Sequence, residues 1–159
     1  MKTNFNSFIR IAAVTIALGL TGITTPTLAV KQTGGEYNTL YAGLGAKGYD
    51  VVAYFTAGKP VQGSDRHVAE YGGVKWQFSS AANAATFKSD PAKYAPQYGG
   101  FCAWGASVGK LFDVDPVNGW QVVDGKLYLN FNADINATFS KDPQSFISKA
   151  NRNWTSLNK

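Results

Sequence analysis

The sequence predicts a small α+β domain built from two β-hairpins, each followed by helices. Strand-like runs flank a Gly72-Gly73 pair and an Asp124-Gly125 pair, and such pairs between apolar runs are typical of hairpin turns. A helix-like segment with a capping residue follows each hairpin. Because strands precede helices in each half, the chain resembles two antiparallel hairpin-plus-helix units packed together, not alternating βαβ units.

The first 29 residues have the pattern of a secretory signal peptide, in which Lys2 and Arg10 precede an apolar run over residues 11–23. The segment Thr27-Leu28-Ala29 resembles a small-x-small cleavage site. The apolar run is shorter than the roughly 20 residues that span a bilayer. We therefore expect export to the periplasm or the extracellular space, with no membrane span after cleavage. An uncleaved N-terminal anchor is the alternative.

The remaining chain is long enough for one domain with a single core. We divide it into an irregular lead-in over residues 30–46, a domain over residues 47–154 and a tail over residues 155–159. Removal of the signal lowers the formal net charge from +5 to +3, because Lys2 and Arg10 are lost. The other lysines are spread singly along the chain, so no basic patch for nucleic acid is expected.

The first unit begins with residues 51–55, whose spacing favours a short helix capped by Asp50 over a buried strand. Two strands are expected next, over residues 66–70 and 74–80. Alternation in the second strand places three large side chains on one face: Val74, Trp76 and Phe78.

A helix is expected over residues 80–88, because Ser79 or Ser80 can cap it. Its apolar stripe is expected to consist of Ala81, Ala84, Ala85 and Phe87. Asp90 and Pro91 have the order typical of a helix start, with the aspartate as cap and the proline in the first turn, and predict a further helical turn.

The second unit repeats the pattern fifty-two residues later. Residues 85–94 align with residues 137–146, and Gly73 aligns with Gly125. The elements predicted for this unit are strands over residues 120–123 and 126–131 and helices over residues 134–140 and 143–154.

Residues 94–105 lie between the repeated segments and contain four aromatic residues, three glycines and the only cysteine of the chain, Cys102. We expect this stretch to pack where the two units meet, and pockets commonly form at such junctions. A single cysteine cannot form an intramolecular disulfide. Cys102 is therefore a buried small hydrophobe, a free thiol or an intermolecular linker.

Four motifs, in this order along the chain, resemble the exported bacterial YHS-domain proteins. They are GYDVVAYF at residues 48–55, WQFSS at 76–80, DPAKYAPQYGGFC at 90–102 and VDGKLYLN at 123–130. The resemblance covers roughly residues 47–154. It implies a small α+β domain related to the YHS and TRASH-like modules that accompany metal-transporting ATPases and metal sensing.

One functional hypothesis is therefore a non-catalytic module that binds copper or zinc. Cys102 and His67 are its candidate ligands, because thiolate and imidazole suit both ions. A four-ligand site needs two more donors, either from acids such as Asp50, Asp113 or Asp115 or from a second chain. No Cys-x-x-Cys or His-x-x-x-His spacing is present, and His67 is otherwise an ordinary strand histidine.

A second hypothesis is thiol-based redox chemistry at Cys102. It needs activation by Lys110 or by a helix N-terminus, because no second cysteine is available. Signatures of hydrolases and of phosphate-binding loops are absent from the sequence. The sequence therefore favours a binding role over an enzyme and offers no candidate catalytic residues.

A third hypothesis is a module that binds a small apolar ligand or a protein partner through aromatic side chains. Its candidate binding residues are Cys102, Tyr98, Phe101 and Trp104, with Tyr94 and Trp120 as further members of the cluster. Aromatic residues also supply core area in a domain of this size, so a structural role is the alternative for each of them.

Overall fold

The structure is a computed structural model that describes residues 36–159. It contains helices and two separate two-stranded antiparallel sheets, so the predicted α+β class is confirmed. The predicted signal peptide lies outside the described residues. No helix within residues 36–159 combines the length and apolar character needed to cross a membrane.

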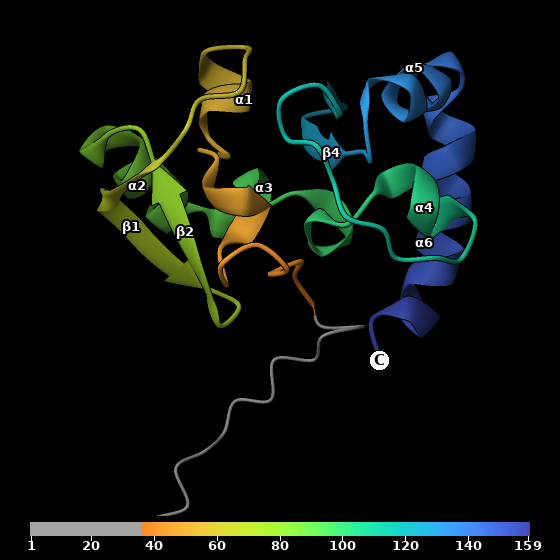
Figure 1. Cartoon of the computed structure of the whole chain (residues 1–159), viewed down its shortest axis with the longest axis horizontal. Coiled ribbons are helices and arrows are strands. Elements are labelled where there is room, and N and C mark those ends of the chain that lie inside the picture. The colour runs from red at the N-terminus through yellow and green to blue at the C-terminus, as the bar shows by residue number, and fades with distance from the viewer. Residues whose placement is uncertain (1–35) are drawn as a thin grey trace, which may run out of the picture.

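The first half of the fold is built around one hairpin. Its elements are η1 (Gly45–Gly48), α1 (Ala53–Thr56), β1 (Ser64–Tyr71), β2 (Val74–Phe78), α2 (Ala81–Ser89) and α3 (Pro91–Tyr94). The second half is built around the other hairpin. Its elements are η2 (Gln97–Gly100), α4 (Ala103–Ser107), β3 (Trp120–Val123), β4 (Lys126–Leu129), α5 (Ala133–Lys141) and α6 (Pro143–Leu157). Figure 1 shows the two halves side by side, with α6 along the outer edge of the second.

Both hairpins turn through two residues in the left-handed region. The φ angles are 60° at Gly72 and 72° at Gly73, and 50° at Asp124 and 71° at Gly125. Positive φ at both central residues is the geometry of the tight turn that suits the twist of a hairpin. The Gly-Gly and Asp-Gly pairs are thus the turns that the sequence predicts.

The helix starts also repeat between the halves. Ser80 caps α2 and Asn132 caps α5, each accepting a hydrogen bond from the amide three residues later, at 3.1 and 2.8 Å. Asp90 and Asp142 cap α3 and α6 in the same manner, at 3.3 and 3.1 Å. The predicted repeat of hairpin and helices is confirmed, and Ser80 rather than Ser79 is the cap of α2.

Several predicted details are wrong. The apolar stripe of α2 is narrower than expected, since Ala84 and Phe87 are buried whereas Ala81 and Ala85 are exposed. β2 ends at Phe78 because the next residue turns away to bind another side chain. α6 continues to Leu157, past the predicted end at residue 154.

The main core joins the two halves. Val51, Val52 and Phe78 from the first half pack in one cluster with Cys102 and Leu127 from the second. A smaller cluster lies entirely within the second half, and its buried members are Tyr98, Ala103, Ala106, Tyr128, Phe139 and Ala150. The stretch over residues 94–105 contributes to both clusters, as expected of a segment at the junction.

Candidate functional site

Cys102 is completely buried at the start of α4. Its sulfur accepts a hydrogen bond from the Gly105 amide at 3.3 Å and thereby caps the helix. Burial raises the pKa of the Cys102 thiol, although the backbone amides of Gly105, Phe131 and Trp104 oppose that increase. The geometry is therefore that of a neutral thiol in a packed core, not that of an exposed nucleophile.

The buried side chain of Asn130 contacts both Cys102 and Trp104. The Asn130 side-chain oxygen lies 3.8 Å from the Cys102 sulfur and accepts a hydrogen bond from the Trp104 amide at 3.1 Å. The Asn130 side-chain nitrogen donates to Asn136 at 2.9 Å, and Asn136 in turn donates to the Trp120 carbonyl at 3.0 Å. Every polar group in this chain of contacts has a partner, so the network fixes the start of α4.

The donors around Cys102 do not fit a copper or zinc site formed by this chain alone. Its polar side-chain neighbour is the amide of Asn130, and His67 lies on β1 in the other half. Among residues 36–159, no group of three or more histidine, cysteine, aspartate and glutamate side chains is placed to hold a metal ion. A metal bound through Cys102, with or without a second chain, stays a prediction.

The candidate aromatic residues do not form one cluster. The Tyr98 ring packs against Tyr128 in a tilted contact and against Trp154 in an edge-to-face contact, with ring centroids 6.0 and 5.7 Å apart, and its hydroxyl donates to Asn151 at 2.9 Å. Tyr94 packs on a different ring in the first half, and Phe101 is 5% exposed. These side chains serve mainly as core.

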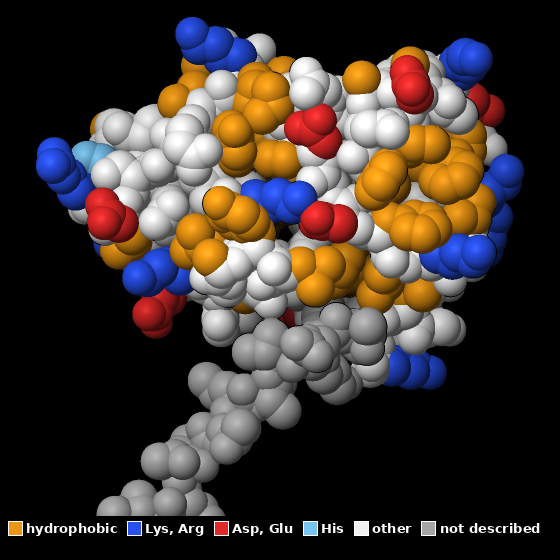
Figure 2. All heavy atoms as spheres, viewed as in Figure 1, with side chains coloured by type: hydrophobic (Ala, Val, Ile, Leu, Met, Phe, Trp, Pro, Cys, Tyr) orange, Lys and Arg blue, Asp and Glu red, His pale blue; other side chains and the backbone are white. Residues whose placement is uncertain are grey.

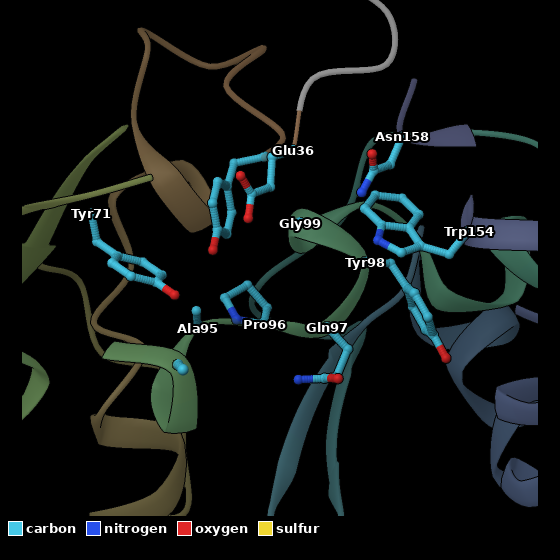
Figure 3. Close-up of a pocket in the computed structure, with 11 residues that line it drawn as sticks. Glu36, Tyr71, Ala95, Pro96, Gln97, Tyr98, Gly99, Trp154 and Asn158 are labelled. Carbon is cyan, nitrogen blue, oxygen red and sulfur yellow. The ribbon is translucent and has the colours of Figure 1, made fainter. Parts of the chain in front are cut away.

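Tyr98 also lines a hollow of about 180 Å³ between the halves, together with Tyr71, Pro96 and Trp154. Figure 3 shows that the Tyr98 ring points away from Tyr71, toward the second half. The hydroxyl of Tyr98 already donates its hydrogen to Asn151 on α6, so that hydrogen is not available to a ligand in this hollow.

Trp104 is the one candidate that reaches an open apolar site. With Phe112, Phe131 and Ile135 it lines a cleft of about 200 Å³, which we call the apolar cleft. Phe112 is 37% exposed and Phe131 is 52% exposed. Figure 2 shows apolar side chains gathered on this part of the surface, over α4 and α5.

The backbone beneath the apolar cleft is closely packed. A Cβ atom added to Gly105 would lie 2.6 Å from the Phe112 ring, so the absence of a side chain at Gly105 lets Phe112 lie against α4. Asn130 holds the amide of Trp104 and directly precedes Phe131 in the chain. The buried network under the cleft therefore positions two of its walls.

Sequence reasoning missed three of the four cleft residues. Phe112 lies between residues 105 and 120, where the sequence predicts no element, and Phe131 falls in the predicted strand over residues 126–131, which ends two residues before it in the structure. β4 ends at Leu129 because the Asn130 backbone instead bonds to Gly119 and Asp115, at 2.6 and 3.0 Å.

A comparison with protein families finds a match in the first half of the fold. The model described as the YHS domain matches residues 52–98. Residues 52–98 are thus similar to the YHS domain. No curated protein and no solved structure shows significant similarity to the chain.

The YHS match runs from the residue before α1 to the middle of η2. It contains the first hairpin, α2 and α3. Cys102 and all four residues of the apolar cleft follow it in the chain, so the site described above lies outside the matched YHS segment.

Proposed function

We propose that this YHS-domain protein is a non-catalytic binding module that holds the apolar part of a small ligand in the apolar cleft. The observation that carries the proposal is the lining of the cleft, which consists of Trp104, Phe112, Phe131 and Ile135. None of these side chains can act as an acid, a base or a nucleophile, and two of them are phenylalanines that the fold leaves exposed. Exposed apolar surface gathered in one concave place is typical of a binding site.

The size of the cleft indicates the class of ligand. An engineered apolar cavity of about 150 Å³ takes up benzene, and the apolar cleft, at about 200 Å³, is slightly larger. Three of its four walls are aromatic, and aromatic rings attract a further ring in offset or edge-to-face contact. We therefore propose a ligand that places one planar or compact apolar group in the cleft.

A second hollow is a weaker candidate because its polar groups already have partners. It has a volume of about 380 Å³, and its lining includes Lys47 and Asp115. The Lys47 amine pairs with Asp113 at 2.6 Å, and Asp115 accepts hydrogen bonds from Val117 and Asn118 at 2.9 and 3.1 Å. A ligand there would have to break contacts that the chain makes within itself.

The metal and thiol hypotheses both depend on Cys102, and its surroundings favour neither. The side chain is fully buried, its sulfur caps α4, and burial raises the pKa of the thiol. A soft metal ion needs a deprotonated sulfur and several further donors. We accordingly base the proposed function on the cleft.

We also propose that the protein is exported, as the pattern of its first 29 residues indicates. Mass measurement of the protein recovered from its native host tests this directly. A chain that starts near Val30 supports export, and an intact N-terminus in the cytoplasm contradicts it.

The experiment for the binding function is an NMR titration of the ¹⁵N-labelled protein with benzyl alcohol, whose ring matches the cleft and whose hydroxyl can face water. Half-burying such a ring removes on the order of 100 Å² of apolar surface from water, which supplies about 2.5 kcal/mol. We therefore expect half-saturation at about 10 mM. The Trp104 indole signal should move, whereas that of Trp76, which is 1% exposed, should not.

Two variants locate the site. F131S removes one wall of the cleft and should weaken benzyl alcohol binding about fivefold or more. Y41S is the matched control, because Tyr41 is also an exposed aromatic residue, at 57%, and lines the hollow of about 380 Å³. Binding that survives F131S, or that is lost in Y41S, would place the site elsewhere and refute the proposal.

A further inference from the structure

The similarity of the two halves extends upstream of the hairpins. η1 contains left-handed residues at Ala46 (φ 46°, ψ 34°) and Lys47 (φ 54°, ψ 28°). η2 contains them at Tyr98 (φ 54°, ψ 38°) and Gly99 (φ 59°, ψ 19°), again fifty-two residues later. Left-handed residues are uncommon outside glycine, and two consecutive ones at matching positions show that this turn belongs to the repeat.

The repeat therefore starts before the helices α1 and α4. We call residues 44–94 the first unit and residues 96–157 the second unit. Tyr49 and Phe101 occupy matching positions after the turns, and the amide of each donates to the carbonyl three residues earlier at 3.0 Å. The next matching pair is Asp50 and Cys102.

Asp50 and Cys102 accept matching backbone hydrogen bonds in their units. Both side chains are fully buried, with Cys102 directly before α4 and Asp50 three residues before α1. The Asp50 carboxylate accepts a hydrogen bond from the Ala53 amide at 3.2 Å, and the Cys102 sulfur accepts one from the matching amide of Gly105 at 3.3 Å. Cys102 is thus the cap of its unit, placed where the first unit has an aspartate.

The two caps differ in what surrounds them. The second oxygen of Asp50 accepts hydrogen bonds from the Ser79 amide and hydroxyl, at 2.8 and 2.6 Å, and from the Asn83 side chain at 2.7 Å. We call Asp50, Ser79 and Asn83 the Asp50 cluster. The residues that match Ser79 and Asn83 in the second unit are Phe131 and Ile135, which are two walls of the apolar cleft.

A third wall of the apolar cleft, Trp104, also differs from its matching residue in the first unit. Val52, which is fully buried in the first unit, matches Trp104. A carboxylate needs several donors when it is buried, so polar residues must gather around Asp50. A thiol makes only weak hydrogen bonds and has no such need. With Cys102 as cap, the positions that match Ser79 and Asn83 are free to be apolar, and the polar neighbour of the sulfur is Asn130 instead.

We infer that the chain contains two tandem copies of the YHS unit, and that the apolar cleft of the second copy stands at the position of the Asp50 cluster in the first. The YHS match at residues 52–98 corresponds, fifty-two residues on, to residues 104–150. Cys102, Trp104, Phe131 and Ile135 are then the residues that give the second copy its preference for an apolar ligand. That preference rests on the proposed function, whereas the equivalence of the two caps does not.

The test transplants the Asp50 cluster into the second unit. C102D alone places a carboxylate at a fully buried position without the counterparts of Ser79 and Asn83, and should shift the unfolding equilibrium by about a hundredfold or more. F131S/I135N alone changes exposed Phe131 and half-buried Ile135, which packs against the main core, and its own cost is measured separately. The triple variant C102D/F131S/I135N supplies the missing donors, so it should recover at least tenfold of the loss caused by C102D.

The measurement is chemical unfolding of all four proteins, followed by circular dichroism, with benzyl alcohol titrations of the folded variants. Recovery in the triple variant, together with loss of binding, supports the inference. If C102D does not fold, folding of the triple variant is the supporting result. A triple variant that is no more stable than the sum of its parts, or that stays unfolded, overturns it. Failure of the wild type to bind benzyl alcohol would refute the proposed function but leave the stability comparison intact.

Discussion

Replacing Asp50 with alanine should be among the most damaging single changes in the first unit. Its carboxylate is fully buried and accepts hydrogen bonds from the Val52 and Ala53 amides as well as from Ser79 and Asn83. Loss of the helix cap costs about 1 kcal/mol. The partly buried donors of Ser79 and Asn83 lose a charged acceptor, which costs about 1–3 kcal/mol for each group. We expect D50A to lower the free energy of unfolding by about 4 kcal/mol.

The assay is urea unfolding of D50A beside a matched cap variant. Asp142 also caps a helix, but it is exposed and accepts one such bond, from the Ser145 amide at 3.1 Å. D142A should therefore cost only about 1 kcal/mol. An unchanged slope of the free energy of unfolding against urea concentration would show that both variants unfold from a native state of the same compactness. A D50A cost no larger than that of D142A would refute the role given to the Asp50 cluster.

Three further predictions address the packing and the charges. G99A should lower the free energy of unfolding by about 3 kcal/mol or more, because a Cβ atom at residue 99 would overlap the carbonyl of Glu36. G125A has the same sign of φ but open space around it, so it should cost about 1 kcal/mol by thermal unfolding. Equal costs would contradict the close contact between Gly99 and Glu36. Cys102 should react with a thiol reagent only in denaturant, since it is fully buried, and rapid labelling of the native protein would contradict its role as a cap. Partial burial opposes ionisation of Asp113, but the ion pair with Lys47 and the hydrogen bonds from the Val114 amide and the Asn38 side chain together outweigh it and lower the Asp113 pKa. That stabilisation is present above the unfolded-state pKa of about 3.9 and is lost as the pH falls through the lower folded-state pKa, so D113N should reduce the loss of stability in acid, and an unchanged pH profile would refute the contribution.

Local signals were sufficient for most of the fold. The Gly-Gly and Asp-Gly pairs identified both turns, and the caps at Asp90 and Asp142 identified two helix starts, because each acts within a few residues of its own position. The end of β4 was misplaced for a different reason. The Asn130 backbone bonds to Gly119 and Asp115, and contacts over that separation leave no local pattern in the sequence.

The candidate site was less accessible to sequence reasoning. Clustering of aromatic residues along the chain pointed to Tyr98, Phe101 and Trp104 together, but the fold directs only Trp104 into a cleft. Phe112, Phe131 and Ile135 come from three other segments, and their proximity depends on how α4 and α5 pack. A comparison of the two copies residue by residue was the signal available, because Ser79 and Asn83 give way to Phe131 and Ile135.

The most direct measurement of the central claim is an isotope-filtered NOE experiment on the ¹³C-labelled protein with unlabelled benzyl alcohol. The structure predicts contacts from the benzyl ring to the Ile135 methyl groups and to the ring protons of Trp104 and Phe131. It predicts none to Tyr41, which lines the other hollow. Contacts to Tyr41 without contacts to Ile135, or no contacts at a concentration that saturates the chemical shifts, would contradict the assignment of the apolar cleft as the binding site.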